Sequence, residues 1–326
     1  MTLTTSDLHR QAQAQLEKAH QPNRLVLLHS AISLGATLLV TFLNYLFSRQ
    51  IAGTGGLGGM DTRSALATAQ SVLELAVMVA LPFWEIGLIR AAICWTRNEH
   101  ADVSTLLTGF RRFGPVLRKN IFQGGMFIAL AMALLYFSTT VYMLTPFSRG
   151  LMELMAPIYE APDPQALFTE AFVAQMGRAV LPIVGIFGVL YAVVAIPLFY
   201  RVRFSDFFVM DGKSAVNSIV ESIRATHGNA WKIFRLDLSF WWFYLLQLLC
   251  VAVTYGDSLL ALAGVSLPIS ADAAFFLFYG LGVVCQLLLL WRYQAKVSTA
   301  YAVAWQDMRT LPASTPVTAA NMPWDM

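Results

Sequence analysis

The chain has 326 residues, of which 57% are hydrophobic and only 13% are charged, and its net charge is +3. Soluble domains usually carry about 25% charged residues. A soluble fold of this composition would expose large apolar patches, which soluble proteins avoid. The composition therefore excludes the ordinary soluble classes and favours a membrane protein, and the small net charge gives no reason to expect a nucleic-acid partner.

Residues 1–24 are polar, with a weak helical stripe formed by Leu8, Ala12, Leu16 and Ala19. We expect this segment to be amphipathic and cytoplasmic. The first apolar run begins only at Leu25 and is too long for the hydrophobic region of a signal peptide. We therefore interpret it as the first membrane span.

Six apolar stretches are long enough to span a bilayer, because a helix rising 1.5 Å per residue needs about 20 residues to cross roughly 30 Å of hydrocarbon. They are residues 25–46, 71–95, 121–144, 179–200, 236–255 and 273–293. The predicted fold is all-α, a polytopic bundle of about six transmembrane helices within residues 25–305. Residues 306–326 are expected to form a disordered cytoplasmic tail. Near the end of the fourth stretch, Pro197 predicts that the helix breaks and the chain leaves the membrane at Phe199 and Tyr200.

The distribution of basic residues predicts the orientation. Only four of the 22 Lys and Arg residues fall in the loops after the first, third and fifth spans: Arg49, Arg63, Arg149 and Arg178. Cytoplasmic loops carry the excess of positive charge. Both termini are therefore expected in the cytoplasm, and the long outer loop 145–178 is expected to include a short helix with Met152, Met155 and Ile158 on its apolar side.

Each odd-numbered span follows a cytoplasmic segment with helical character. One runs through residues 103–117, and another through 216–223 with Ser214 as N-cap. We interpret the chain as three units, each an interfacial helix followed by a helical hairpin, with a pseudo-threefold core. The basic residues of these segments are candidate contacts to lipid headgroups or to a partner: Arg111, Arg112, Arg201, Arg203 and Arg224. They would recognise anionic lipid or a cytosolic protein; alternatively, they anchor the hairpins at the surface.

Two carboxylates in the second span, Glu74 and Glu85, are the strongest candidates for a functional site. They are eleven residues apart, which is about three helical turns, so they share one helix face. A carboxylate at membrane depth is costly and usually faces the protein interior. The two residues could line a proton or cation path. Alternatively, Glu74 reaches the outer interface, and Glu85 pairs with a nearby arginine, either Arg90 or one of Arg201 and Arg203.

Other polar residues are read as structural. Asn44, Gln123, Gln247 and Gln286 lie in spans, where amides commonly hydrogen-bond between helices, and His29 lies just inside the first span. Cys94, Cys250 and Cys285 form no motif and are expected to be free thiols. Residues 53–58 fit the glycine pattern of dinucleotide sites but lie in an outer loop, where a flexible loop is the expected structure.

The sequence contains no metal-ligand spacing and no nucleophile or phosphate-binding motif, so it predicts no cofactor, no metal and no catalytic residue. A cleft that gathered Asp206, Asp211 and His227 would be needed to support an enzyme.

Several runs resemble a bacterial integral-membrane family, domain of unknown function 975. The most specific run is Ala195–Asp206, followed by Gly228–Phe234 and Leu238–Trp241, and residues 8–27 and 106–114 are also similar. The resemblance covers most of residues 5–305, although Phe199 and Val202 depart from it. It implies a bacterial cytoplasmic membrane and no known activity, and it carries over no catalytic residue.

The favoured hypothesis is a non-enzymatic accessory or scaffold protein of the cell envelope, whose partners are the bilayer and either anionic lipids or another membrane protein. One alternative is a small transporter or channel that uses Glu85, for which a polar cavity inside the bundle would be the distinguishing feature. The other is a membrane-embedded enzyme of lipid metabolism.

Overall fold

The computed structural model describes residues 3–53, 60–146, 148–160, 169–262, 264–265 and 268–309. Within these ranges the regular structure is helical, without strands. Five helical segments are long and apolar enough to cross a membrane: Pro22–Phe47, Ala67–Thr96, Phe113–Met143, Phe172–Met210 and Ala271–Arg309. A sixth candidate is a bent pair of shorter helices. The all-α class is confirmed, and these helices identify the chain as a multi-pass membrane protein.

Fourteen helices are described, and their bounds are as follows: α1 Thr5–Lys18, α2 Pro22–Gly53, α3 Met60–Thr96, α4 Val103–Leu106, α5 Thr108–Arg111, α6 Phe113–Met143, α7 Ser148–Glu160, α8 Glu170–Val202, α9 Ser205–Met210, α10 Ala215–Thr226, α11 Ala230–Ser239, α12 Trp241–Thr254, α13 Gly256–Leu262 and α14 Ala271–Arg309. The short outer helix expected within 145–178 is α7. Ser214 stands at the N-cap of α10 as expected, although its side chain makes no capping hydrogen bond.

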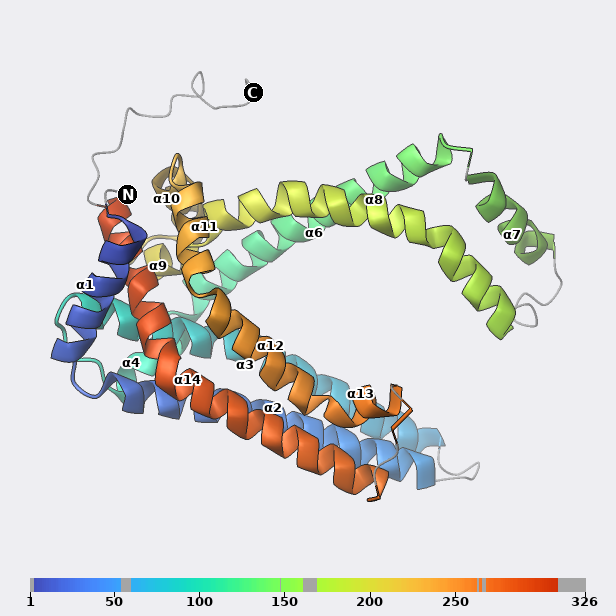
Figure 1. Cartoon of the computed structure of the whole chain (residues 1–326), viewed down its shortest axis with the longest axis horizontal. Helices are drawn as coiled ribbons and strands as arrows, with labels where there is room; N and C mark the ends of the chain where they lie inside the picture. Colours follow the sequence, from blue (N-terminus) through green and yellow to red (C-terminus); the bar gives the residue numbers. More distant parts are fainter. Residues whose placement is uncertain are drawn as a thin grey trace.

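The long helices form two arms that diverge from a common base (Figure 1). One arm, which we call the four-helix arm, contains α2, α3, α12 and α14; the other is the hairpin of α6 and α8, with α7 at its far end. The base contains α1, α4, α5, α9, α10 and α11. The second hairpin reaches the first arm through base helices, since α9 and α10 contact α6 as well as α3 or α14. Three equivalent hairpins around one axis, the expected pseudo-threefold core, are not the arrangement seen here.

The best-packed core lies in the base rather than in the arms. Trp95, Trp305, Phe204 and Phe240 are almost completely buried there. Along the arms, large apolar side chains such as Met132 and Val189 are exposed. Lipid tails solvate such side chains as well as protein does, so the arms need no further apolar cover.

Two predicted spans differ from the structure in detail. Helix α8 continues through Pro182 and Pro197 to Val202, so the predicted break at Pro197 does not occur; a membrane helix tolerates proline because its surroundings accommodate the freed backbone group. The predicted fifth span, 236–255, is not one straight helix. It bends by 57° between α11 and α12, where Ser239 Oγ donates a hydrogen bond to the backbone oxygen of Leu236.

The segment 103–117 is also less regular than its apolar spacing predicts, because it is divided among α4, α5 and the start of α6. Asp102 starts α4 by accepting a hydrogen bond from the backbone N–H of Thr105 at 3.0 Å. Two glycines then allow close packing on α3. A Cβ at Gly87 would collide with the carbonyl of Leu106, and a Cβ at Gly109 would collide with the carbonyl of Phe83.

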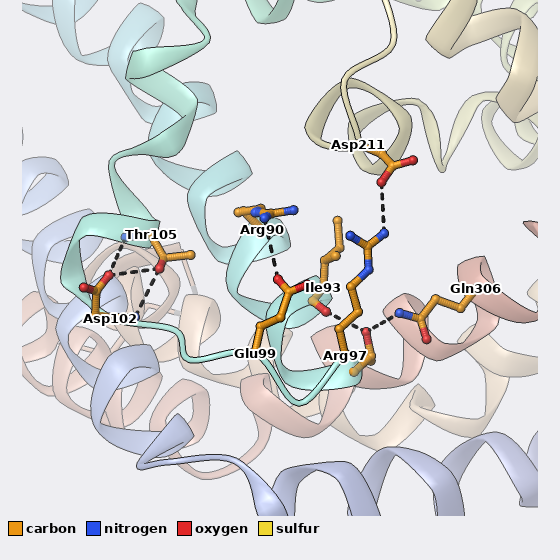
Figure 2. A network of polar contacts seen from close by, with 9 residues as sticks. Arg90, Ile93, Arg97, Glu99, Asp102, Thr105, Asp211 and Gln306 are labelled. Carbon is orange, nitrogen blue, oxygen red and sulfur yellow. Dashed lines mark hydrogen bonds and ion pairs between the residues drawn. The ribbon is translucent and has the colours of Figure 1, made fainter.

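An acidic side chain in the base joins three segments that are distant in sequence. Asp211, which follows α9, lies 2.9 Å from Arg97 Nη2 at the end of α3 and 2.7 Å from Arg309 Nη1 at the end of α14. Figure 2 shows Arg97 reaching Asp211. Both guanidinium groups also lie over the ring of Trp305. The triad of Asp211, Arg97 and Arg309 therefore ties the ends of the four-helix arm to the segment that follows α8.

We expect Gly87→Ala to lower the free energy of unfolding by about 1–3 kcal/mol, the usual cost of overpacking a close contact. The added methyl group would push against the rigid backbone of Leu106. Thermal unfolding in detergent micelles would measure the loss. Gly114→Ala is the matched control, because open space surrounds that position. Equal melting temperatures for the two variants would contradict the close packing of α4 on α3.

We expect Asp211→Asn to destabilise the protein by about 2 kcal/mol, because hydrogen bonds to charged groups contribute about 1.5–3 kcal/mol each and both arginines here are partly exposed. Glu17→Gln, which changes an exposed acid of α1, should stay within about 0.5 kcal/mol of the wild type. Thermal unfolding measured on both variants would test this, and an unchanged melting temperature for Asp211→Asn would show that the triad contributes nothing to stability.

Candidate functional site

A polar pocket lies inside the four-helix arm. Its volume is about 290 Å³. All four helices supply polar side chains to its lining: His29, Ser33 and Thr37 from α2, Glu85 from α3, Gln247 from α12, and Gln286 and Gln294 from α14. The surrounding membrane segments are otherwise apolar, so this pocket is a concentrated polar region at membrane depth.

Helical spacing explains why these side chains meet. His29, Ser33 and Thr37 recur every four residues on α2, and Gln286 and Gln294 are eight residues apart on α14 with Leu290 between them. Residues four apart lie above one another on a helix face. Because α14 packs against α2, α3 and α12, the polar stripes of these helices converge on one volume.

Glu85 is the acidic group of this pocket. Ser33 Oγ donates a long hydrogen bond of 3.4 Å to its Oε1, and His29 Nε2 lies 3.9 Å from its Oε2. The Glu85 side chain is 55% exposed. Its carboxylate is thus only weakly satisfied by protein groups and faces open space, which leaves it available to a ligand.

His29 is held firmly beside Glu85. Its Nε2 lies 3.2 Å from the carbonyl oxygen of Trp84, and a carbonyl only accepts hydrogen bonds, so Nε2 carries the proton. The His29 ring stacks on Trp84 with centroids 5.3 Å apart, and Trp84 Nε1 donates to the backbone oxygen of His29 at 3.1 Å. These contacts fix the imidazole as an N–H donor at the edge of the pocket.

Glu74 lies elsewhere on the same helix face. It accepts a 2.6 Å hydrogen bond from Asn44 Nδ2 of α2 and a 3.2 Å bond from Gln70. Both Glu74 and Glu85 thus contact α2, which confirms the shared face that their spacing predicts. Two amides satisfy Glu74, however, and it does not line the pocket.

None of the three arginines considered as partners of Glu85 lines its pocket, and two of them form ion pairs elsewhere. Arg90 lies 3.7 Å from Glu99, as Figure 2 shows, and Arg203 lies 3.0 Å from Asp237. The Asp237 carboxylate also accepts a hydrogen bond from Tyr301. These ion pairs belong to the base and to the end of α3, away from the pocket lining.

The five basic residues expected at headgroups or partners divide into two groups. Arg112 and Arg203 serve internal contacts: Arg112 donates to the carbonyl of Val209 at 2.8 Å, and Arg203 pairs with Asp237. Arg111, Arg201 and Arg224 are exposed, and Arg224 lies 3.5 Å from Glu221 in its own helix.

The acids considered for catalysis form separate ion pairs. Asp206 lies 2.5 Å from Lys119 Nζ, and Asp211 binds Arg97 and Arg309, so the two carboxylates serve different contacts. In the described ranges no group of three His, Cys, Asp or Glu side chains is placed to hold a metal ion. Of the glycine-rich pattern at residues 53–58, Gly53 is the last described residue, and residues 54–58 lie outside the described ranges.

Sequence reasoning identified Glu85 but missed the set around it. His29, Ser33, Thr37 and Gln294 were not assigned to the site, and Gln247 and Gln286 were read as packing residues. The regular spacing of polar residues on α2 and α14 was the available signal. It identifies a polar stripe, but only the packing of the helices shows that the stripes face each other.

Comparisons with protein families, curated proteins and solved structures find no match to this chain. The resemblance to the family with domain of unknown function 975 therefore stays a prediction.

We expect Glu85→Gln to raise the melting temperature in detergent by a few degrees, because a poorly satisfied carboxylate among apolar helices costs stability that the neutral amide does not. The same substitution at Glu74 should lower it, since it weakens the charge-assisted bond from Asn44. Because the two substitutions should change the melting temperature in opposite directions, each variant serves as the control for the other. A loss of stability in Glu85→Gln equal to that in Glu74→Gln would show that Glu85 has a structural role.

Proposed function

We propose that this chain is a membrane transport protein for a small cation that donates several hydrogen bonds, with Glu85 as the group that selects positive charge. The observation that supports it is the half-exposed Glu85 carboxylate inside a polar pocket formed by four membrane helices. Ionisable residues inside membrane segments commonly mark ion and substrate pathways.

The chemistry of the lining favours a cationic solute. The carboxylate of Glu85 is the acidic lining group, and no Lys or Arg is among the lining residues. The amide oxygens of Gln247, Gln286 and Gln294 and the hydroxyls of Ser33 and Thr37 can all accept hydrogen bonds. A ligand with one positive charge and several N–H donors would satisfy this set.

The size of the pocket limits the solute. Ligand pockets commonly measure about 300–1,000 Å³, and this one, at about 290 Å³, is at the lower limit. A planar or tetrahedral cation of a few heavy atoms fits, whereas a lipid or a peptide does not.

The depth of the pocket favours transport over simple binding at the surface. His29 lies seven residues into α2, and Glu85 lies eleven residues before the end of α3. At 1.5 Å per residue these positions are roughly 10 and 16 Å from the helix ends. Transporters place their sites at such depth, between helices.

The location we propose is the bacterial cytoplasmic membrane, with both termini in the cytoplasm. The distribution of Lys and Arg supports the orientation, and the family resemblance supports the compartment. A scaffold role is supported by the exposed Arg111, Arg201 and Arg224, but it gives the intramembrane carboxylate no purpose. A lipid-metabolising enzyme has less support, since Asp206 and Asp211 are both ion-paired.

The test uses purified protein in proteoliposomes, with a potassium gradient and valinomycin to make the interior negative. Guanidinium is the probe, because it is small, rich in N–H donors and charged at every accessible pH. We expect the wild type to take up labelled guanidinium faster than protein-free liposomes. Glu85→Gln should lower the protein-dependent rate at least about tenfold, since it removes the negative charge from the lining of the pocket.

Glu74→Gln is the control for this experiment, because it makes the same change on the same helix face outside the pocket. It should retain uptake close to that of the wild type. Equal uptake by the wild type and Glu85→Gln, or no wild-type uptake above protein-free liposomes, would overturn the proposal.

A further inference from the structure

A second pocket, of about 580 Å³, lies at the cytoplasmic end of α2. One wall is formed by His20 and Gln21 from the loop between α1 and α2 and by Arg24 from the first turn of α2. The loop between α3 and α4 forms the opposite wall with His100 and Asp102. We call it the interfacial pocket, because it lies where the first membrane span begins.

The lining of the interfacial pocket is polar at one end and apolar at the other. Arg24, His20 and His100 lie at the polar end, and the two imidazole rings are 5.7 Å apart between centroids. One to two turns further along α2, Leu27, Leu28 and Ala31 form the apolar end. Leu28 is 36% exposed. The pocket therefore matches an amphiphile oriented along the span.

The positive charge at the polar end has no carboxylate partner within the described residues. Arg24 Nη1 donates to the neutral Gln21 Oε1 at 3.2 Å. The nearby carboxylate of Asp102 is occupied by the start of α4: hydrogen bonds from the Ser104 and Thr105 side chains hold the pKa of Asp102 below its usual range. The remaining N–H groups of Arg24 are available to an anion.

The backbone around this pocket is unusual as well. Gln21 has a φ of 48° and Asn98 a φ of 56°, and these are the non-glycine residues with positive φ in the described chain. Each lies in one of the two loops that form the pocket. Such conformations cost energy, and His20 and Arg24, on either side of Gln21 in the sequence, line the same cavity.

We propose that the interfacial pocket binds one anionic phospholipid of the cytoplasmic leaflet. The phosphodiester would accept hydrogen bonds from Arg24 and the imidazole N–H groups, and an acyl chain would lie on Leu27, Leu28 and Ala31. The apolar end distinguishes this ligand from a soluble phosphate, which would leave half the pocket without contact. This site is separate from the Glu85 pocket, and the proposal does not depend on cation transport.

Native mass spectrometry of the full chain in mild detergent tests this, after detergent exchange and addition of either phosphatidylglycerol or phosphatidylcholine. We expect one phosphatidylglycerol to be retained in preference to phosphatidylcholine. Arg24→Gln should weaken its apparent affinity about fivefold, which corresponds to the roughly 1 kcal/mol that one basic residue contributes at an anionic leaflet. Leu28→Asn should weaken it as well, without any change of charge.

Arg111→Gln is the matched control, since it removes an exposed cytoplasmic arginine outside the pocket. Its lipid retention and its melting temperature should equal those of the wild type. An excess of inorganic phosphate should leave the lipid bound, whereas displacement by phosphate would indicate a soluble anion site. Equal retention of the two lipids, or equal affinity in Arg24→Gln and the wild type, would refute the proposal.

Discussion

The contact between Asp211 and the two arginines Arg97 and Arg309 determines how the arms of this molecule are held. Asp211 belongs to the segment after the α6–α8 hairpin. Its two partners lie at the ends of α3 and α14, which are the second helices of the α2–α3 and α12–α14 hairpins. One partly buried carboxylate thus pairs with two cations, one from the end of α3 and one from the end of α14. Both guanidinium groups lie over Trp305, which is fully buried in the best-packed region of the described chain. Together with the packing of α9 and α10 against both arms, this joint sets the position of one arm relative to the other.

Lipid as solvent explains why such a joint suffices. In water, the exposed apolar faces of α6 and α8 would drive the arms together, but lipid tails are as apolar as leucine and supply no such force. Helix association in the four-helix arm accordingly uses polar contacts as well. Asn44 bonds to Glu74, and Tyr279 donates to Thr41 Oγ1 at 2.8 Å. The pocket at Glu85 differs from these pairs because its hydrogen bond from Ser33 to Glu85 is long, at 3.4 Å, and the carboxylate stays half-exposed.

The sequence predicted most of the fold, because a membrane span is a local property: twenty apolar residues must be helical when no water is present to satisfy the backbone. The common face of Glu74 and Glu85 was predictable for the same reason. The predictions that failed concern features that depend on the neighbouring helices. Whether Pro197 ends a helix is decided by neighbouring groups, and the bend at Phe240 is decided by packing in the base. The pocket could not be predicted from local sequence at all. His29, Glu85 and Gln286 are separated by long stretches of chain, and only the packing of the helices brings them together.

Helix α2 belongs to both proposed sites, and this gives them a physical relation. His29 and Ser33 face the Glu85 pocket, while Leu27, Leu28 and Ala31 face the interfacial pocket. Arg24 precedes His29 by five residues, which is roughly 7–8 Å along the helix. An anionic lipid held at Arg24 would therefore place its negative charge close to the end of the Glu85 pocket that lies toward the start of α2, and we propose that this pocket selects cations. Charge of one sign near such an entrance raises the local concentration of the opposite ion, so a bound lipid would favour cation entry without touching Glu85.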